Sequence, residues 1–171
     1  MLVLDTSAFI SLGICDCVEI LLDEFDFHTS EAVMDELEKM SGYDDLEADV
    51  AEIWLERKNQ LNVHQVGEAG EFDHSKIDRG EGSCAVLARK IDAEFLITDD
   101  IRALPLLKNI ASTEVVISPI VLKAVVKRGL LSDDEAKGKL EKLIENRDWF
   151  ETPIYERSVE LFEDGSREDR M

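Results

Sequence analysis

The chain has 171 residues, of which 44% are hydrophobic, and its 39 acidic and 19 basic side chains give a formal net charge of -20. This length and composition suit one domain with a sizeable core. The acidic excess argues against strong non-specific attraction to nucleic acid or to an anionic membrane. No apolar run approaches the roughly 20 residues of a membrane span, and the first residues show no basic-then-apolar signal pattern. We therefore expect a cytoplasmic protein that does not contact a membrane.

Short apolar runs alternate with helical patterns along the chain. Strands are predicted over residues 1–4, 61–66, 94–98 and 114–117, which are rich in β-branched or large apolar residues. Helices are predicted over residues 8–14, 17–25, 30–40, 44–60, 78–92 after an initial turn, 101–109, 119–129, 132–146 and 153–162. Strands that alternate with helices predict a parallel sheet covered on both faces.

Helix boundaries are marked by residue types that favour them. Thr6 or Ser7 can cap the first helix, and Ser132 can cap the helix that follows it in the sequence. Pro119 at a first helical position and Gly129 past the end bracket the helix between them. These signals place the ends of the elements but not their packing.

The cysteines and histidines predict neither a disulfide framework nor a zinc site. The cysteines are Cys15, Cys17 and Cys84, and the histidines are His28, His64 and His74. Three cysteines cannot all pair with one another, and a Cys-x-Cys motif without a nearby His or Cys partner is a poor metal site. We interpret the cysteines as packing residues and the histidines as ordinary surface or core positions.

Two of the predicted strands end on carboxylates. The stretch 1-MLVLD-5 ends at Asp5, and 94-EFLITDD-100 ends at Asp99 and Asp100. In parallel sheets of this kind, ligands bind at the carboxyl ends of the strands, where the strand order switches. Carboxylates gathered at one point repel one another and cost stability unless a cation lies between them. The strand ends therefore raise the question of a metal site.

Two further acids lie beside apolar faces of predicted helices. Glu36 neighbours the face marked by Val33 and Leu37, and Glu81 begins the helix that follows 80-GEG-82. Taken alone, each is more typical of a solvated surface, and Glu81 also suits the first turn of a helix because of the helix dipole. Their significance depends on the motifs around them.

Four motifs in this order resemble those of PIN domains, the fold of many metal-dependent ribonucleases, including the VapC-type toxins of toxin–antitoxin pairs. They are 4-LDTSAFI-10, 31-EAVMDELEKM-40, 80-GEGSCAVLAR-89 and 96-LITDD-100. The stretch 129–156 also resembles a two-helix extension found in one branch of PIN proteins. Many of the toxins carry Asp at the third acidic position, where this chain has Glu81, which points to a sub-branch.

The resemblance implies a three-layer α/β/α PIN-like fold with a central, mostly parallel sheet and a C-terminal helical extension. The nuclease domain would span residues 1–130, the appended helices of the same domain 131–162, and a flexible tail 163–171. The implied activity is that of a metal-dependent endoribonuclease that hydrolyses RNA phosphodiester bonds, either the toxin of a toxin–antitoxin pair or an RNA-processing nuclease.

The resemblance also implies a site that holds one or two Mg²⁺ or Mn²⁺ ions, which suit carboxylate oxygens and retained waters. The inner ligands would be Asp5, Glu36 and Asp99. Glu81 and Asp100 would bind a second ion, directly or through water. Carboxylates or a phosphate oxygen would be held by hydrogen bonds from Thr6, Ser7 and Thr98.

A basic stretch follows the Asp pair and offers contacts for the RNA backbone. Residues 101–131 carry five bases and one acid. The RNA-binding candidates are Arg102, Lys123, Lys127 and Arg128. The alternative is that these bases only solvate two helices.

The family resemblance implies protein partners as well as RNA. PIN toxins usually pair, and the apolar segments 8–14 and 119–126 offer surface for a homodimer. A toxin would also have an antitoxin protein as partner.

Two other function classes stay open. An Asp-nucleophile phosphatase also begins with a strand that ends in Asp, but it needs a second Asp two residues later, where this chain has Ser7. A non-catalytic PIN module would use the same fold only to bind RNA or a protein, because a fold does not determine a function.

Overall fold

The computed structural model describes residues 1–67 and 77–168, within which five strands form one sheet. The strands are β1 (Leu2–Leu4), β2 (Phe27–Ser30), β3 (Asn62–His64), β4 (Phe95–Ile97) and β5 (Glu114–Val116). They pair in the order β3-β2-β1-β4-β5, and every pair is parallel. The predicted parallel sheet is confirmed, and its strand order switches direction between β1 and β4. Asp5 directly follows β1, and Asp99 lies two residues after the end of β4.

The helices fall close to their predicted ranges. They are α1 (Thr6–Ile14), α2 (Val18–Glu24), α3 (Glu31–Met40), α4 (Leu46–Glu56), α5 (Arg79–Lys90), α6 (Leu104–Ile110), α7 (Pro119–Lys127), α8 (Asp133–Asn146) and α9 (Pro153–Glu168), with a short 3₁₀ turn η1 (Lys58–Gln60) after α4. Pro119 occupies the first turn of α7, and Gly129 has a positive φ of 73° just past its end, as predicted. Ser132 caps α8 through a capping box with Glu135.

Three local predictions are corrected. The N-cap of α1 is Asp5, not Thr6 or Ser7. Strand β2 was not predicted, because 27-FHTS-30 contains only one large apolar residue and owes its strand conformation to pairing with β1 and β3. Helix α9 continues to Glu168, past its expected end at residue 162, since a polar composition alone does not stop a helix.

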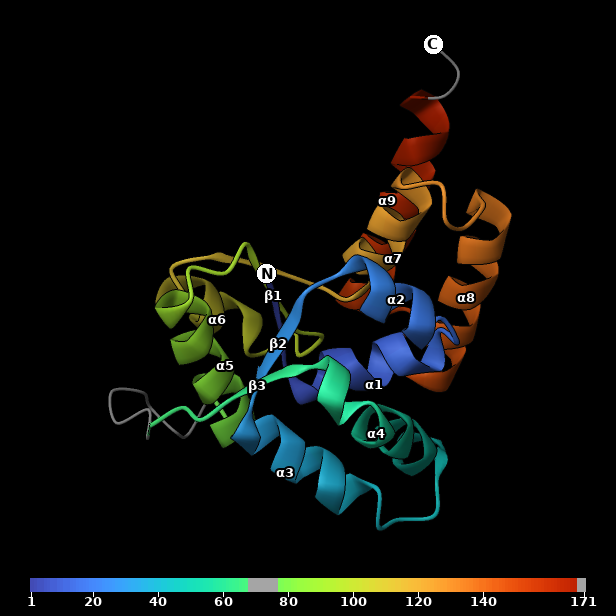
Figure 1. The fold of residues 1–171 in the computed structure, drawn as a ribbon. Coiled ribbons are helices and arrows are strands. Elements are labelled where there is room, and N and C mark those ends of the chain that lie inside the picture. Colours follow the sequence, from blue (N-terminus) through green and yellow to red (C-terminus); the bar gives the residue numbers. More distant parts are fainter. Residues whose placement is uncertain (68–76, 169–171) are drawn as a thin grey trace.

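Helices cover both faces of the sheet (Figure 1). Helix α5 contacts β1, β2 and β4 and packs beside α6, while α1 contacts β1 and packs against α4 and α8. This is the predicted three-layer α/β/α architecture. Within the described residues, no helix combines the length and the apolar character that a membrane span requires.

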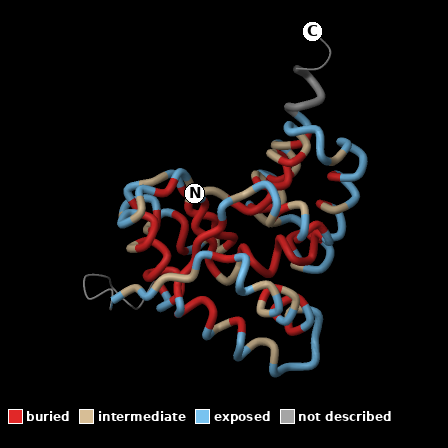
Figure 2. Tube along the Cα trace, in the orientation of Figure 1, coloured by how far each residue is buried: buried red, intermediate tan, exposed pale blue. Residues whose placement is uncertain are grey.

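Helix α1 is enclosed by its neighbours. Every residue from Ala8 to Ile14 is buried, and α1 is red along nearly its whole length in Figure 2. Trp54 of α4 donates its indole N–H to the carbonyl of Phe9 at 2.7 Å and packs edge-on against the Phe9 ring. The segment 8–14 therefore has no free apolar surface for a homodimer, because the single chain already buries it.

The C-terminal helices share the core of the rest of the chain. Helices α7, α8 and α9 pack on one another, and α8 also packs on α1 (Figure 1). Leu140, Leu143, Trp149, Ile154 and Phe162 belong to the same buried cluster as the sheet residues. This packing also orients α7, whose first residue follows Ser118.

Candidate active site

Asp5 lies at the carboxyl end of β1 and caps α1. Its carboxylate accepts hydrogen bonds from the backbone N–H of Ala8 at 2.9 Å and from the hydroxyl of Ser7 at 2.7 Å. The side chain is almost fully buried, and this burial raises its pKa to about 7 against the hydrogen bonds that lower it. The same residue thus begins a helix and places a carboxylate at the switch point of the sheet.

Glu36 reaches the same region from α3. The hydroxyl of Thr6 donates to its carboxylate, and burial raises the pKa of this half-buried group. A Cβ atom added at Gly80 would lie 2.6 Å and 2.8 Å from the two Glu36 carboxylate oxygens. A side chain at position 80 would displace this carboxylate from its present place, so Gly80 leaves room for Glu36 beside α5.

Glu81 lies in the first turn of α5 and forms a capping box with Asp78. The Glu81 N–H donates to the Asp78 carboxylate at 2.8 Å, and the Asp78 N–H donates to the Glu81 carboxylate at 3.1 Å. Burial raises the pKa of Glu81 to about 8, and the charges of Asp78, Asp100 and Asp5 add to the effect. These acids therefore lie close enough to act on one another.

Asp99 is buried and turned toward α7. Its carboxylate accepts two hydrogen bonds of 2.7 Å from the backbone N–H and the hydroxyl of Ser118, the N-cap residue of α7. Its own N–H donates to the Ser7 hydroxyl at 2.9 Å, and that hydroxyl donates to Asp5. Burial raises the pKa of Asp99 despite the bonds from Ser118. Each of its oxygens accepts a hydrogen bond from Ser118, so Asp99 ties β4, α1 and α7 together.

Asp100 is only partly buried and carries an arginine beside it. Its carboxylate accepts from the Arg102 backbone N–H at 2.9 Å and lies 3.5 Å from the Arg102 guanidinium. Burial would raise the pKa of Asp100, but these hydrogen bonds outweigh it and hold the pKa below its usual value. The buried Thr98 hydroxyl accepts from the Asp100 N–H at 3.2 Å and stabilises the turn after β4.

The donor set suits a hard divalent cation. It consists of carboxylates, and neither Asp5 nor Glu81 has a hydrogen bond or ion pair with a Lys or Arg among the described residues. Burial is the largest cause of the raised pKa values of Asp5, Glu36 and Glu81, and neighbouring acids add to it. A cation bound among these carboxylates would lower the pKa values again. As the side chains stand, however, no group of three His, Cys, Asp or Glu residues in the described ranges is arranged to hold a metal ion. Glu36 and Glu81 are instead engaged by Thr6 and Asp78.

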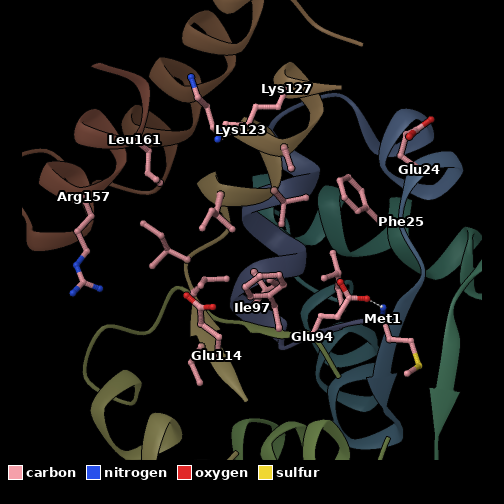
Figure 3. Close-up of a pocket in the computed structure, with 18 of the residues that line it drawn as sticks. Met1, Glu24, Phe25, Glu94, Ile97, Glu114, Lys123, Lys127, Arg157 and Leu161 are labelled. Atoms are coloured by element: carbon pink, nitrogen blue, oxygen red, sulfur yellow. Dashed lines mark hydrogen bonds and ion pairs between the residues drawn. The ribbon is translucent and has the colours of Figure 1, made fainter. Parts of the chain in front are cut away.

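Most of the predicted RNA-binding bases lie away from the acids. Lys123 and Lys127 line a pocket of about 940 Å³, across from Met1, Glu94 and Glu114 at the starts of β1, β4 and β5 (Figure 3). Lys123 is buried, 3.7 Å from Asp133 and over the ring of Phe162.

Arg128 is also committed to contacts within the chain. Its guanidinium binds Glu24 at 3.1 Å and stacks over Phe25. Among the four predicted bases, only Arg102 adjoins the acidic residues, and its side chain is 93% exposed. The other three bases follow the Asp pair in the sequence but lie away from the site, because α7 runs away from the carboxyl ends of the strands.

Sequence reasoning missed several residues of the site. Asp78 was readable as a capping partner, because Asp three residues before Glu is the capping-box pattern. Arg79, which is 76% exposed and 3.8 Å from Asp35, directly precedes Gly80. Ser118 had no local signal, because its role depends on the contact between β4 and α7.

Comparison with known proteins supports the same fold. No curated protein and no solved structure matches the chain. A family model described as PIN domain matches residues 1–164, which include every acid of the site and nearly all of the C-terminal helices. This fold is of the nuclease type, and the chain belongs to the PIN-domain family.

Proposed function

We propose that this protein is a metal-dependent endoribonuclease that hydrolyses RNA phosphodiester bonds at the acidic cluster. The observation that carries the proposal is the meeting of Asp5, Glu36, Glu81 and Asp100 at the switch point of a PIN-domain sheet, with two of their pKa values raised to about 7 and about 8. Charge of this kind is costly in a stable fold and is typical of functional sites.

Asp5, Glu36, Glu81 and Asp100 are the residues we assign to hold Mg²⁺ or Mn²⁺. When bound, such an ion neutralises charge on a phosphoryl oxygen and supplies a water of lowered pKa. Glu36 and Glu81 would exchange their hydrogen bonds from Thr6 and Asp78 for the cation, and Ser7 would keep Asp5 oriented. We assign Asp99 a positioning role, because each of its oxygens accepts a hydrogen bond from Ser118 and the side chain is turned toward α7.

The phosphatase and the non-catalytic PIN module are the two alternatives to this proposal. The phosphatase alternative is dropped, because Ser7 bridges Asp5 and the Asp99 N–H where that chemistry needs a second carboxyl group. The non-catalytic PIN module stays as the competitor. It predicts RNA binding without cleavage in Mg²⁺, in Mn²⁺ and in a chelator.

The first test joins cleavage to metal-linked stability. We expect cleavage of single-stranded RNA in Mg²⁺ or Mn²⁺ and none in EDTA. Burial raises the pKa of Asp5 from 3.8 to about 7 and that of Glu81 from 4.5 to about 8. Their contribution to stability is therefore fully present below the ordinary pKa values and is lost as pH rises from there to the raised values. Mg²⁺ should therefore raise the melting temperature more at pH 8 than at pH 6. An equal shift at both pH values would place the metal elsewhere.

Arg79 and Arg102 are the bases that we assign to the RNA backbone on either side of the acids. Replacing either by Ala should weaken RNA binding and reduce the salt slope of binding by about 0.7 for a lost phosphate contact on a single strand. Arg157→Ala, at the distant pocket, is the matched control and should leave the slope unchanged. If Lys127→Ala changes the slope and the two arginine variants do not, the RNA follows the pocket instead.

Pairing and an antitoxin stay predictions. Of the two apolar segments, only 119–126 offers surface, where Ile120 and Ala124 line the pocket. That pocket is lined by five Lys or Arg and five Asp or Glu side chains, so two chains of charge -20 would repel each other little there. We propose a homodimer through this surface, and sedimentation equilibrium of Ala124→Glu against the parent checks it. The toxin role would require an antitoxin that binds this chain, which co-purification with the product of an adjacent gene would reveal.

A further inference from the structure

Two histidines far apart in the sequence meet on neighbouring strands at one edge of the sheet. Nδ1 of His28 in β2 lies 2.8 Å from Nε2 of His64 in β3, and Nε2 of His28 lies 2.9 Å from the Asp26 carboxylate. The Asn62 side-chain amide donates to the other Asp26 oxygen at 2.8 Å. His28 is buried, and β3 is an edge strand that pairs with β2 alone. The spacing of these histidines in the sequence had indicated no joint role.

The geometry of the two rings indicates a shared proton. The ring centroids are 5.1 Å apart, the ring planes are 24° from parallel, and the facing nitrogens are 2.8 Å apart. The two distances differ by about the width of one ring, which is the difference expected when two rings point at each other in one plane. The rings therefore meet edge to edge, nearly coplanar, and the contact has the length of one N–H···N hydrogen bond. A zinc ion on the line between them would need the nitrogens about 4 Å apart, at roughly 2.0–2.1 Å for each bond.

Such a bond limits how many protons the two rings can hold. One nitrogen must donate and the other must accept, while the second nitrogen of His28 donates to Asp26. The pair can carry one positive charge and keep both bonds. A second proton places N–H groups on both sides of the contact, which breaks the bond and sets two imidazolium ions side by side.

We propose that Asp26, His28 and His64 form an acid-sensitive clasp that holds the edge strand β3 in the sheet and opens when the pair takes up its second proton. The strand is only three residues long, and this contact adds to its backbone pairing with β2 and to the Asn62 side chain, which also donates to the Phe27 carbonyl at 3.1 Å.

The surrounding charges favour this behaviour. Burial lowers the pKa of His64, and the positive charges of His28 and Lys90 lower it further. The hydrogen bond from His28 is the main cause that lowers the pKa of Asp26, against a smaller opposing effect of burial, so this carboxylate stays ionised as its partner.

The other charged neighbours have separate partners. The Met1 ammonium also acts on Asp26 but is bound to Glu94. On α3, which packs against β3, Asp35 and Glu38 lie near Arg79 and Lys58. The stabilisation from a histidine of lowered pKa is present at neutral pH and is lost as pH falls below the ordinary value of about 6.5.

The acidic cluster responds to pH in the opposite sense, so the test must read β3 directly. Amide hydrogen exchange of β3 is compared between pH 7.5 and pH 5.5, corrected for the intrinsic exchange rate, in the parent, His64→Gln and the control His74→Gln. A Gln side chain can still bond His28 but cannot take a proton. We expect opening of β3 in the parent and in His74→Gln to increase by up to about tenfold at pH 5.5, the factor by which a free imidazole is more protonated there. His64→Gln should show no such increase.

A second measurement needs no variant to fold. Ring nitrogen chemical shifts of the parent, followed by NMR between pH 8 and pH 4.5, should show the two rings titrating in two linked steps, with one ring staying neutral well below the ordinary histidine pKa. The proposal is overturned if both rings titrate independently near 6.5. It is equally overturned if β3 exchange in the parent and in His64→Gln changes alike with pH.

Discussion

Asp5→Asn is expected to lower RNA cleavage by more than about 100-fold. Loss of a residue that only supports a metal ligand costs up to about 100-fold, so a larger loss indicates a ligand. The proposed role requires a charged oxygen at the end of β1, and an amide has none. The substitution is nearly isosteric, and the amide oxygen can still accept from the Ala8 N–H and the Ser7 hydroxyl. Loss of activity should therefore occur in a folded chain.

The stability of the same variant separates a site defect from a folding defect. Burial raises the pKa of Asp5 from 3.8 to about 7, so in the absence of metal the parent loses stability as pH rises between these two values. Asp5→Asn removes this loss, and its metal-free melting temperature should exceed that of the parent at pH 8 and approach it at pH 5. The Mg²⁺-induced rise in melting temperature should shrink as well.

Asp23→Asn supplies the matched control, since Asp23 is an exposed carboxylate on α2. It should leave cleavage, metal response and melting temperature close to those of the parent. Cleavage by Asp5→Asn at the parental rate would show that the acidic cluster is not the catalytic site.

Substitutions of Asp99 and Asp100 should have different effects on cleavage and stability, although the two residues are adjacent in the sequence. Asp100→Asn is expected to lower cleavage as Asp5→Asn does, with a change in the free energy of unfolding of less than about 1 kcal/mol, because the side chain is partly exposed. Asp99→Ala is expected to reduce the free energy of unfolding by about 2–4 kcal/mol, because the buried N–H and hydroxyl of Ser118 lose their acceptors.

Asp99→Asn decides whether Asp99 is also a metal ligand. An amide can accept from the Ser118 N–H and donate to the Ser118 hydroxyl, so α7 should stay in place. Cleavage should then persist within about tenfold of the parent rate, because the loss of a metal ligand would cost more than that. Urea unfolding and single-turnover cleavage on the same samples give both quantities. If Asp99→Asn loses cleavage while its unfolding free energy is unchanged, Asp99 is a ligand, as the family resemblance implied.

The alternation of short apolar runs with helical patterns was enough to predict the parallel sheet and its two covering layers. Period and turn residues are local properties, and a parallel strand order then follows because each crossover needs a helix. The same reasoning placed Asp5, Asp99 and Asp100 together at the carboxyl ends of the strands. The positions of Pro119 and Gly129 are also local signals, since each acts through its own backbone.

Other features of the molecule were decided only by tertiary packing. Strand β2 exists because β1 and β3 pair with it, and its register alone brings His28 to His64. Which Asp of the pair faces the other acids depends on the turn after β4 and on the contact with Ser118.

The basic residues make the same point. The pocket lined by the starts of the strands contains three of the predicted RNA-binding bases, Lys123, Lys127 and Arg128. Helix α5 instead places Arg79 beside the acids, although Arg79 is distant in the sequence from Arg102. Side-chain chemistry can be read from the sequence residue by residue. The direction in which each side chain points depends on helices and strands that are far away along the chain, and only the folded structure determines that.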